Sequence, residues 1–199
     1  MKEELGMDLW LAVGLGNPGA RYAANRHNVG ALVIDALAER HRVTLAKHKG
    51  SATAAKITVG GAPVLIAIPT TFMNVSGEPV RDLARFYKIP PARVIVVHDE
   101  LDIEFGLVRL KLGGGEGGHN GLRSVSALLG TRDYHRVRVG VGRPPGRMDP
   151  ADFVLRDFSA AEKPEIAVSV VEAADAVEDL VTGGLLAAQQ RFHAPGGTR

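Results

Sequence analysis

Five asparagines supply the uncharged hydrogen-bonding chemistry of this sequence. They lie where we expect strands to give way to loops, at Asn17, Asn25, Asn28, Asn74 and Asn120. Each loop also contains or adjoins a titratable group, with candidates at His27, His98–Asp99 and His119. Ligands of α/β proteins bind in the loops that leave the strand ends, so these side chains indicate a binding site for a polar ligand. Asparagine is also an ordinary turn residue, and the pattern alone leaves a structural role open.

A glycine-rich segment, GGGEGGHNG, runs from Gly113 to Gly121. Glycines in a loop allow positive φ angles and a close approach of the backbone to a bulky ligand. We therefore expect a flexible gate that presents Asn120 at its end. A phosphate cradle built from successive backbone N–H groups is the competing interpretation.

Two other patterns suggest chemistry, but their context argues against it. The run Gly14–Gly19 matches the dinucleotide signature G-x-G-x-x-G. However, the helical apolar stripe begins only at Val29, and the ribose-binding acid expected at the end of the next strand is missing. The run His98–Asp102 contains four residues of metal-ligand type, but at most half could face one ion because strand residues alternate between faces. We expect no metal site there, and the sequence also lacks Walker A and G-x-S-x-G motifs.

The elements that must position these residues alternate between strands and helices. Apolar and alternating runs predict strands at 9–15, 52–59, 62–68, 94–97, 107–112 and 135–141. Helical periodicity predicts helices at 29–37, 77–87 and 122–129, and a long one from near Pro164 to Gly183–Gly184. A Gly60-Gly61 hairpin joins the second and third strands, and Ser159–Glu162 resembles a capping box. This order predicts a single α/β domain, a twisted mixed β-sheet with helices on both faces.

Length and composition are consistent with one domain. A chain of 199 residues with 45% apolar and 23% charged residues can bury one sizeable core. We expect the folded domain to span 9–193, with an N-terminal extension at 1–8 and a disordered tail at 194–199. The lack of cysteine, of a signal peptide and of a long apolar run favours a cytoplasmic protein with no membrane segment. No heptad repeat requires a partner, so a monomer is expected.

Charge is distributed unevenly along the chain, although the net charge is only +2. Basic residues outnumber acidic ones between 104 and 150, and acidic residues dominate 157–181. Strand alternation places Arg109 and Lys111 on one face, and Arg136 and Arg138 repeat this arrangement on a later strand. Such residues suit phosphate contacts, which give salt-dependent affinity with little sequence reading. Two solvated faces would give the same charge runs, and the charges alone do not decide between these interpretations.

Five blocks of the sequence together resemble one family. They are GLGNPGARYAANRHNVG (Gly14 to Gly30), PTTFMNVSG (Pro69 to Gly77), HDELD (His98 to Asp102), KLGGGEGGHNGLRS (Lys111 to Ser124) and HRVRVGVGRP (His135 to Pro144). In order and spacing they resemble the signature blocks of bacterial peptidyl-tRNA hydrolases, from about Leu9 to Phe192. That family cleaves the ester that joins a peptide to the terminal adenosine ribose of tRNA. The resemblance implies peptidyl-tRNA as partner, recognised at its acceptor end and 3′-terminal adenosine.

The resemblance also implies roles for individual residues. The catalytic histidine falls on His27, its partner aspartate on Asp99, and the asparagine that distinguishes blocked from free aminoacyl groups on Asn17. The implied substrate-binding positions are Tyr22, Phe72, Met73, Asn74 and Asn120. The pair that holds the terminal 5′-phosphate of tRNA falls on Lys111 and Arg138, and strand alternation adds Arg109 beside them.

The chemistry of these residue types agrees with the implied roles. Ester hydrolysis by water needs a base that is neutral near pH 7, and the ordinary pKa of histidine is about 6.5. Asp99 would fix the tautomer of His27 if it accepts the other ring N–H. Asn74 or Asn120 could donate to a developing oxyanion, and Asn17 could bind the neutral amide of a peptidyl group.

Two hypotheses remain. The first is a hydrolase of peptidyl-tRNA that needs no metal or other cofactor and acts through activated water. The second is a noncatalytic RNA-binding module on the same fold.

Overall fold

The computed structural model describes residues 8–48 and 50–193. The expected tail at 194–199 and all of the expected extension at 1–8 except Asp8 lie outside these ranges. Within them, no helix is both long enough and apolar enough to cross a membrane.

The centre of the molecule is a seven-stranded sheet with the order β2-β3-β4-β1-β5-β7-β6. The strands are β1 (Trp10–Gly14), β2 (Ala46–Lys47), β3 (Ala52–Val59), β4 (Ala62–Pro69), β5 (Val94–Glu100), β6 (Val108–Leu112) and β7 (His135–Gly140). β1 runs parallel to β4 and β5, and β5 runs parallel to β7. β2, β3 and β6 each pair antiparallel with a neighbour, so the sheet is mixed, as predicted.

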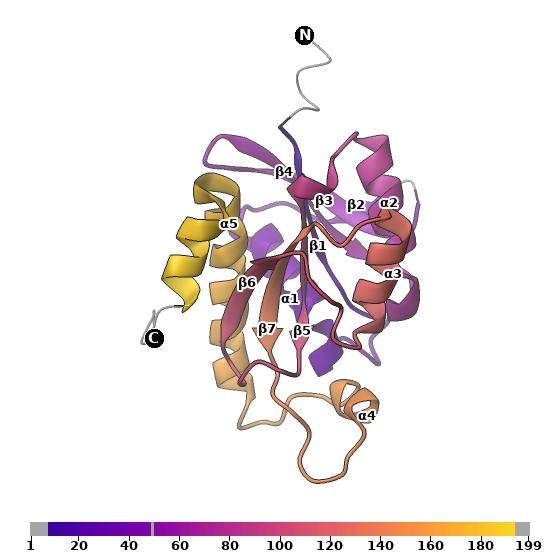
Figure 1. Cartoon of the computed structure of the whole chain (residues 1–199), viewed down its shortest axis with the longest axis vertical. Coiled ribbons are helices and arrows are strands. Elements are labelled where there is room, and N and C mark those ends of the chain that lie inside the picture. Colours follow the sequence, from indigo (N-terminus) through magenta and orange to yellow (C-terminus); the bar gives the residue numbers. More distant parts are fainter. Residues whose placement is uncertain (1–7, 49, 194–199) are drawn as a thin grey trace.

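Helices cover both faces of this sheet (Figure 1). They are α1 (Val29–Arg40), α2 (Gly77–Phe86), α3 (Asn120–Leu129), α4 (Pro150–Val154) and α5 (Lys163–His193), with short 3-10 helices η2 (Arg26–Asn28), η3 (Met73–Val75) and η4 (Pro91–Arg93). The sheet separates two hydrophobic cores. Alternate residues of β1 belong to different cores: Ala12 packs with α1 and α5, whereas Leu11 and Val13 pack with α2 and α3. This alternation explains why the buried strands are apolar on both faces.

The predicted helix from Pro164 to Gly184 forms, but the chain then continues as a second helical stretch. Ser159 and Glu162 form the predicted capping box, in which the Glu162 N–H donates to Ser159 Oγ at 3.2 Å and the Ser159 N–H donates to Glu162 Oε1 at 2.8 Å. Gly184, with φ 83° and ψ 171°, breaks the helical geometry. The helical stretch from there to His193 was not predicted from the sequence, and neither were β2 and α4.

This second stretch of α5 covers the edge strand β6. The Gln189 side chain donates to the Leu110 carbonyl at 3.1 Å, and His193 Nε2 accepts from the Leu110 N–H at 2.9 Å. Arg109 donates to the Phe192 carbonyl at 2.8 Å. These contacts satisfy backbone groups that an open sheet edge would leave unpaired.

The parallel strands bring their loops together at one edge of the sheet. β1, β4, β5 and β7 all end there, so the segment after β1, η3, the end of β5 and the loop after β7 lie close to one another. Gly30 permits a close approach of α1 to β5, since a Cβ on it would lie 2.2 Å from the Val97 carbonyl oxygen. The absence of that Cβ lets the start of α1 touch β5, which brings His27 next to Asp99.

Candidate active site

A cavity of about 600 Å³ opens at this edge of the sheet. Seven of the residues predicted for the site line it: Asn17, His27, Phe72, Met73, Asn74, Asp99 and Asn120. They come from segments spread over most of the chain, namely the loop after β1, η2, η3, β5 and the start of α3. The topology therefore gathers the polar loop residues that the sequence analysis singled out.

His27, which is half-buried, and Asp99, which is buried, form the centre of the site. His27 Nδ1 lies 2.9 Å from Asp99 Oδ2 and 3.0 Å from Oδ1. An ionised carboxylate only accepts hydrogen bonds. Nδ1 of the neutral ring therefore carries the proton and donates a hydrogen bond to Asp99. Nε2 of His27 is then an unprotonated base on a residue that lines the cavity.

His119 is a second imidazole on the same carboxylate. Its Nε2 lies 2.8 Å from Asp99 Oδ1, while its Nδ1 caps α3 by accepting from the Leu122 N–H at 3.3 Å. The cap leaves Nε2 as the protonated nitrogen, which fixes the tautomer of His119. From the sequence, His119 was expected only as a titratable group in the glycine loop and not as a site residue.

The charges of these groups shift each other's protonation. Burial alone would lower the pKa of His27, but the charge of Asp99 and the hydrogen bond to it raise that pKa above its ordinary value. Burial would raise the pKa of Asp99, but His27 and His119 hold it far below its usual range. On the opposite face of β5, burial and the charge of His119 lower the pKa of His98 to about 3, so His98 is neutral.

The three groups His27, Asp99 and His119 are also of metal-ligand type, with ligand atoms within 4.8 Å of one another. The surrounding hydrogen bonds do not suit a metal ion. A ligating nitrogen must be unprotonated, but Nε2 of His119 carries a proton because its Nδ1 accepts from the Leu122 N–H. If Nε2 bound a metal ion, Nδ1 would carry the proton, and two donors, Nδ1–H and the Leu122 N–H, would then face each other. The geometry therefore suits a hydrogen-bonded relay.

The side chain of Asn17 is held through its amide oxygen, which leaves its NH₂ group available to a ligand. Its Oδ1 accepts from the Met73 N–H at 2.7 Å. Asn28 fixes the backbone of Asn17 through two further hydrogen bonds, of 2.9 and 2.8 Å. Since Oδ1 is engaged, Nδ2 is the group that Asn17 can offer to a ligand, as a donor. Asn74 and Asn120 are exposed, and neither side chain has a hydrogen bond within the described residues.

Asn25 and Asn28, by contrast, are buried and hold the structure together. Asn25 Nδ2 donates to Asp157 Oδ1 at 2.6 Å, and the neighbouring Arg26 pairs with Glu162 at 2.7 Å. These contacts fasten η2 to the segment before α5. Two of the five asparagines therefore have a structural role. This is the alternative that the sequence pattern alone left open.

Apolar side chains form the cavity walls. Phe72, 58% exposed, stands at the surface, while Met73 is buried beneath it. Tyr22 does not line the cavity but packs its ring edge-on against Phe72, with ring centroids 6.4 Å apart. The opposite wall includes Val154 and Leu155 at the end of α4, an element that the sequence analysis missed. The signal for α4 was present, because Asp149-Pro150 is a typical helix start.

The predicted phosphate-binding residues lie together on strands β6 and β7. Arg109 is directly opposite Arg138 in the register, and Lys111 is opposite Arg136. Burial and the neighbouring arginines lower the pKa of Lys111, and burial also lowers the pKa of Arg138. Mutual repulsion of this kind marks a cluster of positive charge that favours an anion. Arg109 also donates to the Val108 and Phe192 carbonyls, so it additionally holds α5.

Arg136 does not repeat the arrangement of Arg138, contrary to the sequence analysis. Its side chain is 0% exposed, and its guanidinium donates to backbone carbonyls of the glycine loop. Strand alternation predicted the face correctly but could not show that the glycine loop covers this arginine.

Comparison with known proteins agrees with the geometry. The family model for peptidyl-tRNA hydrolase matches residues 11–198. The peptidyl-tRNA hydrolase of Frankia alni is 61% identical over 185 residues, covering 93% of this chain and 94% of that protein. The one of Nocardia farcinica is 61% identical over 184 residues, covering 92% and 95%. The crystal structure of the Acinetobacter baumannii peptidyl-tRNA hydrolase superimposes with a TM-score of 0.88 at 36% identity, covering 94% of this chain and 95% of that one. The chain therefore belongs to the peptidyl-tRNA hydrolase family.

Proposed function

We propose that this member of the family hydrolyses the ester bond of peptidyl-tRNA with His27 as general base and without a metal ion. The observation that carries the proposal is the contact of 2.9 Å between His27 Nδ1 and Asp99, which leaves Nε2 unprotonated on a residue lining the cavity. Positioned general-base catalysis contributes about 10² to 10⁴ in rate.

In the proposed reaction, His27 Nε2 takes a proton from water as the water oxygen bonds to the acyl carbon. Asp99 stabilises the imidazolium that forms. Asn74 or Asn120, whose side chains have no hydrogen bond inside the described structure, donates to the oxyanion of the tetrahedral intermediate. The bond from the acyl carbon to the ribose oxygen then breaks, and that oxygen takes the proton from His27. The products are a peptide with a free carboxyl group and a tRNA with a free ribose hydroxyl.

Selectivity for blocked aminoacyl groups follows from the orientation of Asn17. Its Oδ1 accepts from the Met73 N–H, and its Nδ2 makes no hydrogen bond to any of the described residues, so Nδ2 is available as a donor. An amide carbonyl of a peptidyl group can accept from this donor. A free aminoacyl group carries an amine with a pKa of about 8, and its ammonium form has only donors to offer. Two donors facing each other disfavour binding of the unblocked substrate.

Recognition of the tRNA acceptor end is assigned to the positive cluster of Lys111, Arg138 and Arg109. Lys111 and Arg138 each carry a pKa lowered by burial and by neighbouring cations, which supports binding of a terminal phosphate. Phe72 and Met73 provide the apolar wall for the peptidyl-adenosine end, and Tyr22 supports Phe72 from outside the cavity. We further propose that the protein acts as a monomer in the cytoplasm, and sedimentation at micromolar concentration tests the oligomeric state.

The proposal is tested by following deacylation of N-acetylaminoacyl-tRNA in the presence of excess chelator. We expect turnover that survives chelation, and much slower release from the same tRNA carrying an unblocked aminoacyl group. Loss of turnover on chelation would contradict the metal-independent mechanism. Binding of the substrate without any turnover would instead select the noncatalytic RNA-binding module.

A further inference from the structure

Arg136, on β7, is the largest fully buried side chain in the described structure, and the proposed reaction does not use it. β7 lies between β5 and β6, so neighbouring strands enclose the residue on both sides. Burying a guanidinium is costly unless its charge is balanced by hydrogen bonds. The hydrogen bonds that Nη1 and Nη2 of Arg136 donate go to backbone carbonyls, while its buried Nε has no partner among the described residues.

Most of these carbonyls belong to the glycine loop. Nη1 donates to the Gly115 carbonyl at 2.6 Å, and Nη2 donates to the Gly114 carbonyl at 2.9 Å. A weaker contact of 3.4 Å joins Nη2 to the carbonyl of Arg132, just before β7. The guanidinium also lies over the Tyr134 ring, 4.6 Å from its centroid. One side chain thus connects the loop to the sheet.

The backbone of the loop is shaped to make these contacts. Gly114 has a φ of 95°, which an L side chain rarely adopts, and a Cβ there would lie 3.0 Å from Lys111 Nζ. The Gly113 N–H donates to the Tyr134 carbonyl at 3.0 Å. The left-handed conformation therefore turns the Gly114 carbonyl toward Arg136 while the chain remains bonded to β7.

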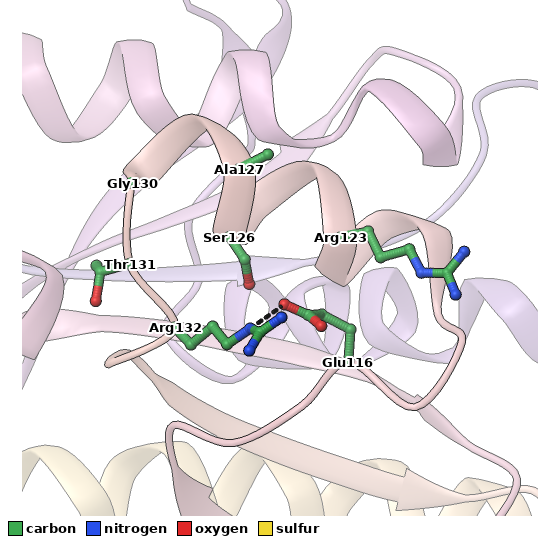
Figure 2. A pocket seen from close by; sticks show the side chains of 7 residues that line it. All are labelled: Glu116, Arg123, Ser126, Ala127, Gly130, Thr131 and Arg132. Carbon is green, nitrogen blue, oxygen red and sulfur yellow. Dashed lines mark hydrogen bonds and ion pairs between the residues drawn. The ribbon is translucent and has the colours of Figure 1, made fainter.

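A second contact holds the same part of the loop from outside. Figure 2 shows Glu116 reaching toward Arg132 across a hollow of about 440 Å³ beside α3, with an ion pair of 2.8 Å between them. Burial opposes ionisation of Glu116, but hydrogen bonds from Arg132 and Ser126 lower its pKa. The loop is thus fixed over residues 113–116.

The next two glycines form a turn, which the His119 N–H closes by donating to the Glu116 carbonyl at 3.0 Å. A Cβ on Gly118 would meet no atom within 4 Å, and one on Gly117 would meet only Glu100 Oε2 at 3.9 Å. Immediately after them come His119, bonded to Asp99, and Asn120, which lines the cavity. Gly117 and Gly118 therefore join the anchored half of the loop to the active site.

We propose that Arg136 is a positioning residue, which anchors residues 113–116 so that His119 and Asn120 keep their places at the cavity. This inference rests on the proposed function of the cavity, because Arg136 acts on the reaction only through the loop. A displacement of about 1 Å at a reacting group can reduce the rate about 10²-fold. The glycine loop is then a half-anchored loop, and not a gate that is flexible along its whole length.

Arg136→Lys tests the anchor, because an ammonium cannot reproduce the planar two-carbonyl contact of a guanidinium. In the folded variant we expect faster hydrogen exchange in peptides covering 113–121. We also expect kcat to fall about 10- to 100-fold while KM changes by less than about threefold. Arg138→Lys is the matched control on the same strand. It should raise KM and leave the exchange of the loop unchanged.

Gly114→Ala tests the same contact from the side of the loop, at an exposed position whose substitution leaves the sheet intact. It should reproduce the faster exchange and the lower kcat, whereas Gly115→Ala, where a Cβ meets open space, should exchange like the wild type. If Arg136→Lys does not fold, Gly114→Ala decides the question. Unchanged exchange and unchanged kcat in whichever variant folds would overturn the proposal. Because exchange does not require turnover, it tests the anchor even if the proposed reaction fails.

Discussion

At the level of single residues, the site depends on one carboxylate shared by two imidazoles. Asp99 accepts from His27 at 2.9 Å and from His119 at 2.8 Å, which fixes both tautomers. The same carboxylate raises the pKa of His27 above its ordinary value. A general base works only when neutral, so activity should fall as the pH drops through this raised pKa.

Asp99→Asn tests that coupling. The amide removes the negative charge that raises the pKa of His27, so the acid limb of the profile of kcat/KM against pH should move to lower pH. The plateau should fall by about 10² to 10⁴, because Asn no longer holds the productive tautomer. Steady-state kinetics between about pH 5 and pH 8, the range in which histidine titrates, measure both effects. An acid limb that stays in place would show that a group other than His27 controls it.

Among the elements, the contact between α1 and β5 brings His27 and Asp99 together. Gly30 permits this contact, and a Cβ there would lie 2.2 Å from the Val97 carbonyl oxygen. The backbone of β5 cannot shift without disturbing its pairing with β1 and β7. The position of His27 relative to Asp99 therefore depends on a residue that does not touch substrate.

Gly30→Ala should destabilise the fold by about 1–3 kcal/mol through overpacking. Gly183→Ala is the matched control, because its Cβ would meet only Ala187 at the ordinary distance of 3.6 Å and the position is helical. That change should be neutral or stabilise by up to about 1 kcal/mol. Urea denaturation of both variants measures the difference. Equal stability of the two variants would refute this account of the contact.

The sequence predicted most elements of this architecture, but not all of the site. Period-two and helical patterns located the central strands and α1 to α3, because each buries one side or both. The final stretch of α5 was missed because Gly184 looks like the end of a helix, and only the need to cover the edge of β6 explains why the chain turns helical again. His119 and Arg136 were misjudged for a related reason. Their roles come from contacts with Asp99 and with the glycine loop, and no local pattern records them.

For the whole molecule, the positive cluster on β6 and β7 lies beside the cavity, so one ligand can contact both. Glu100, which follows Asp99 in the sequence and lines the cavity, acts electrostatically on both Lys111 and Arg138. A tRNA whose terminal phosphate binds the cluster would bring its 3′ end to His27. The cluster should then control affinity, and the cavity should control turnover.

Lys111→Ala and Arg138→Ala should each weaken tRNA binding and reduce the slope of log Kd against log salt concentration by about 1. Arg81→Ala on α2, whose arginine pairs with Asp82 away from the cavity, is the matched control and should leave the slope unchanged. Fluorescence titration at several salt concentrations measures the slopes. The same slope for all four proteins would place the terminal phosphate elsewhere.

The most direct test of the mechanism is the single-turnover rate of N-acetylaminoacyl-tRNA hydrolysis by His27→Ala, measured with saturating enzyme so that binding does not limit the rate. The substitution removes the base at Nε2 but leaves Lys111 and Arg138 in place, so tRNA affinity should change little. We expect the rate to fall by about 10² to 10⁴. A rate equal to that of the wild type would contradict the proposal that His27 activates the water.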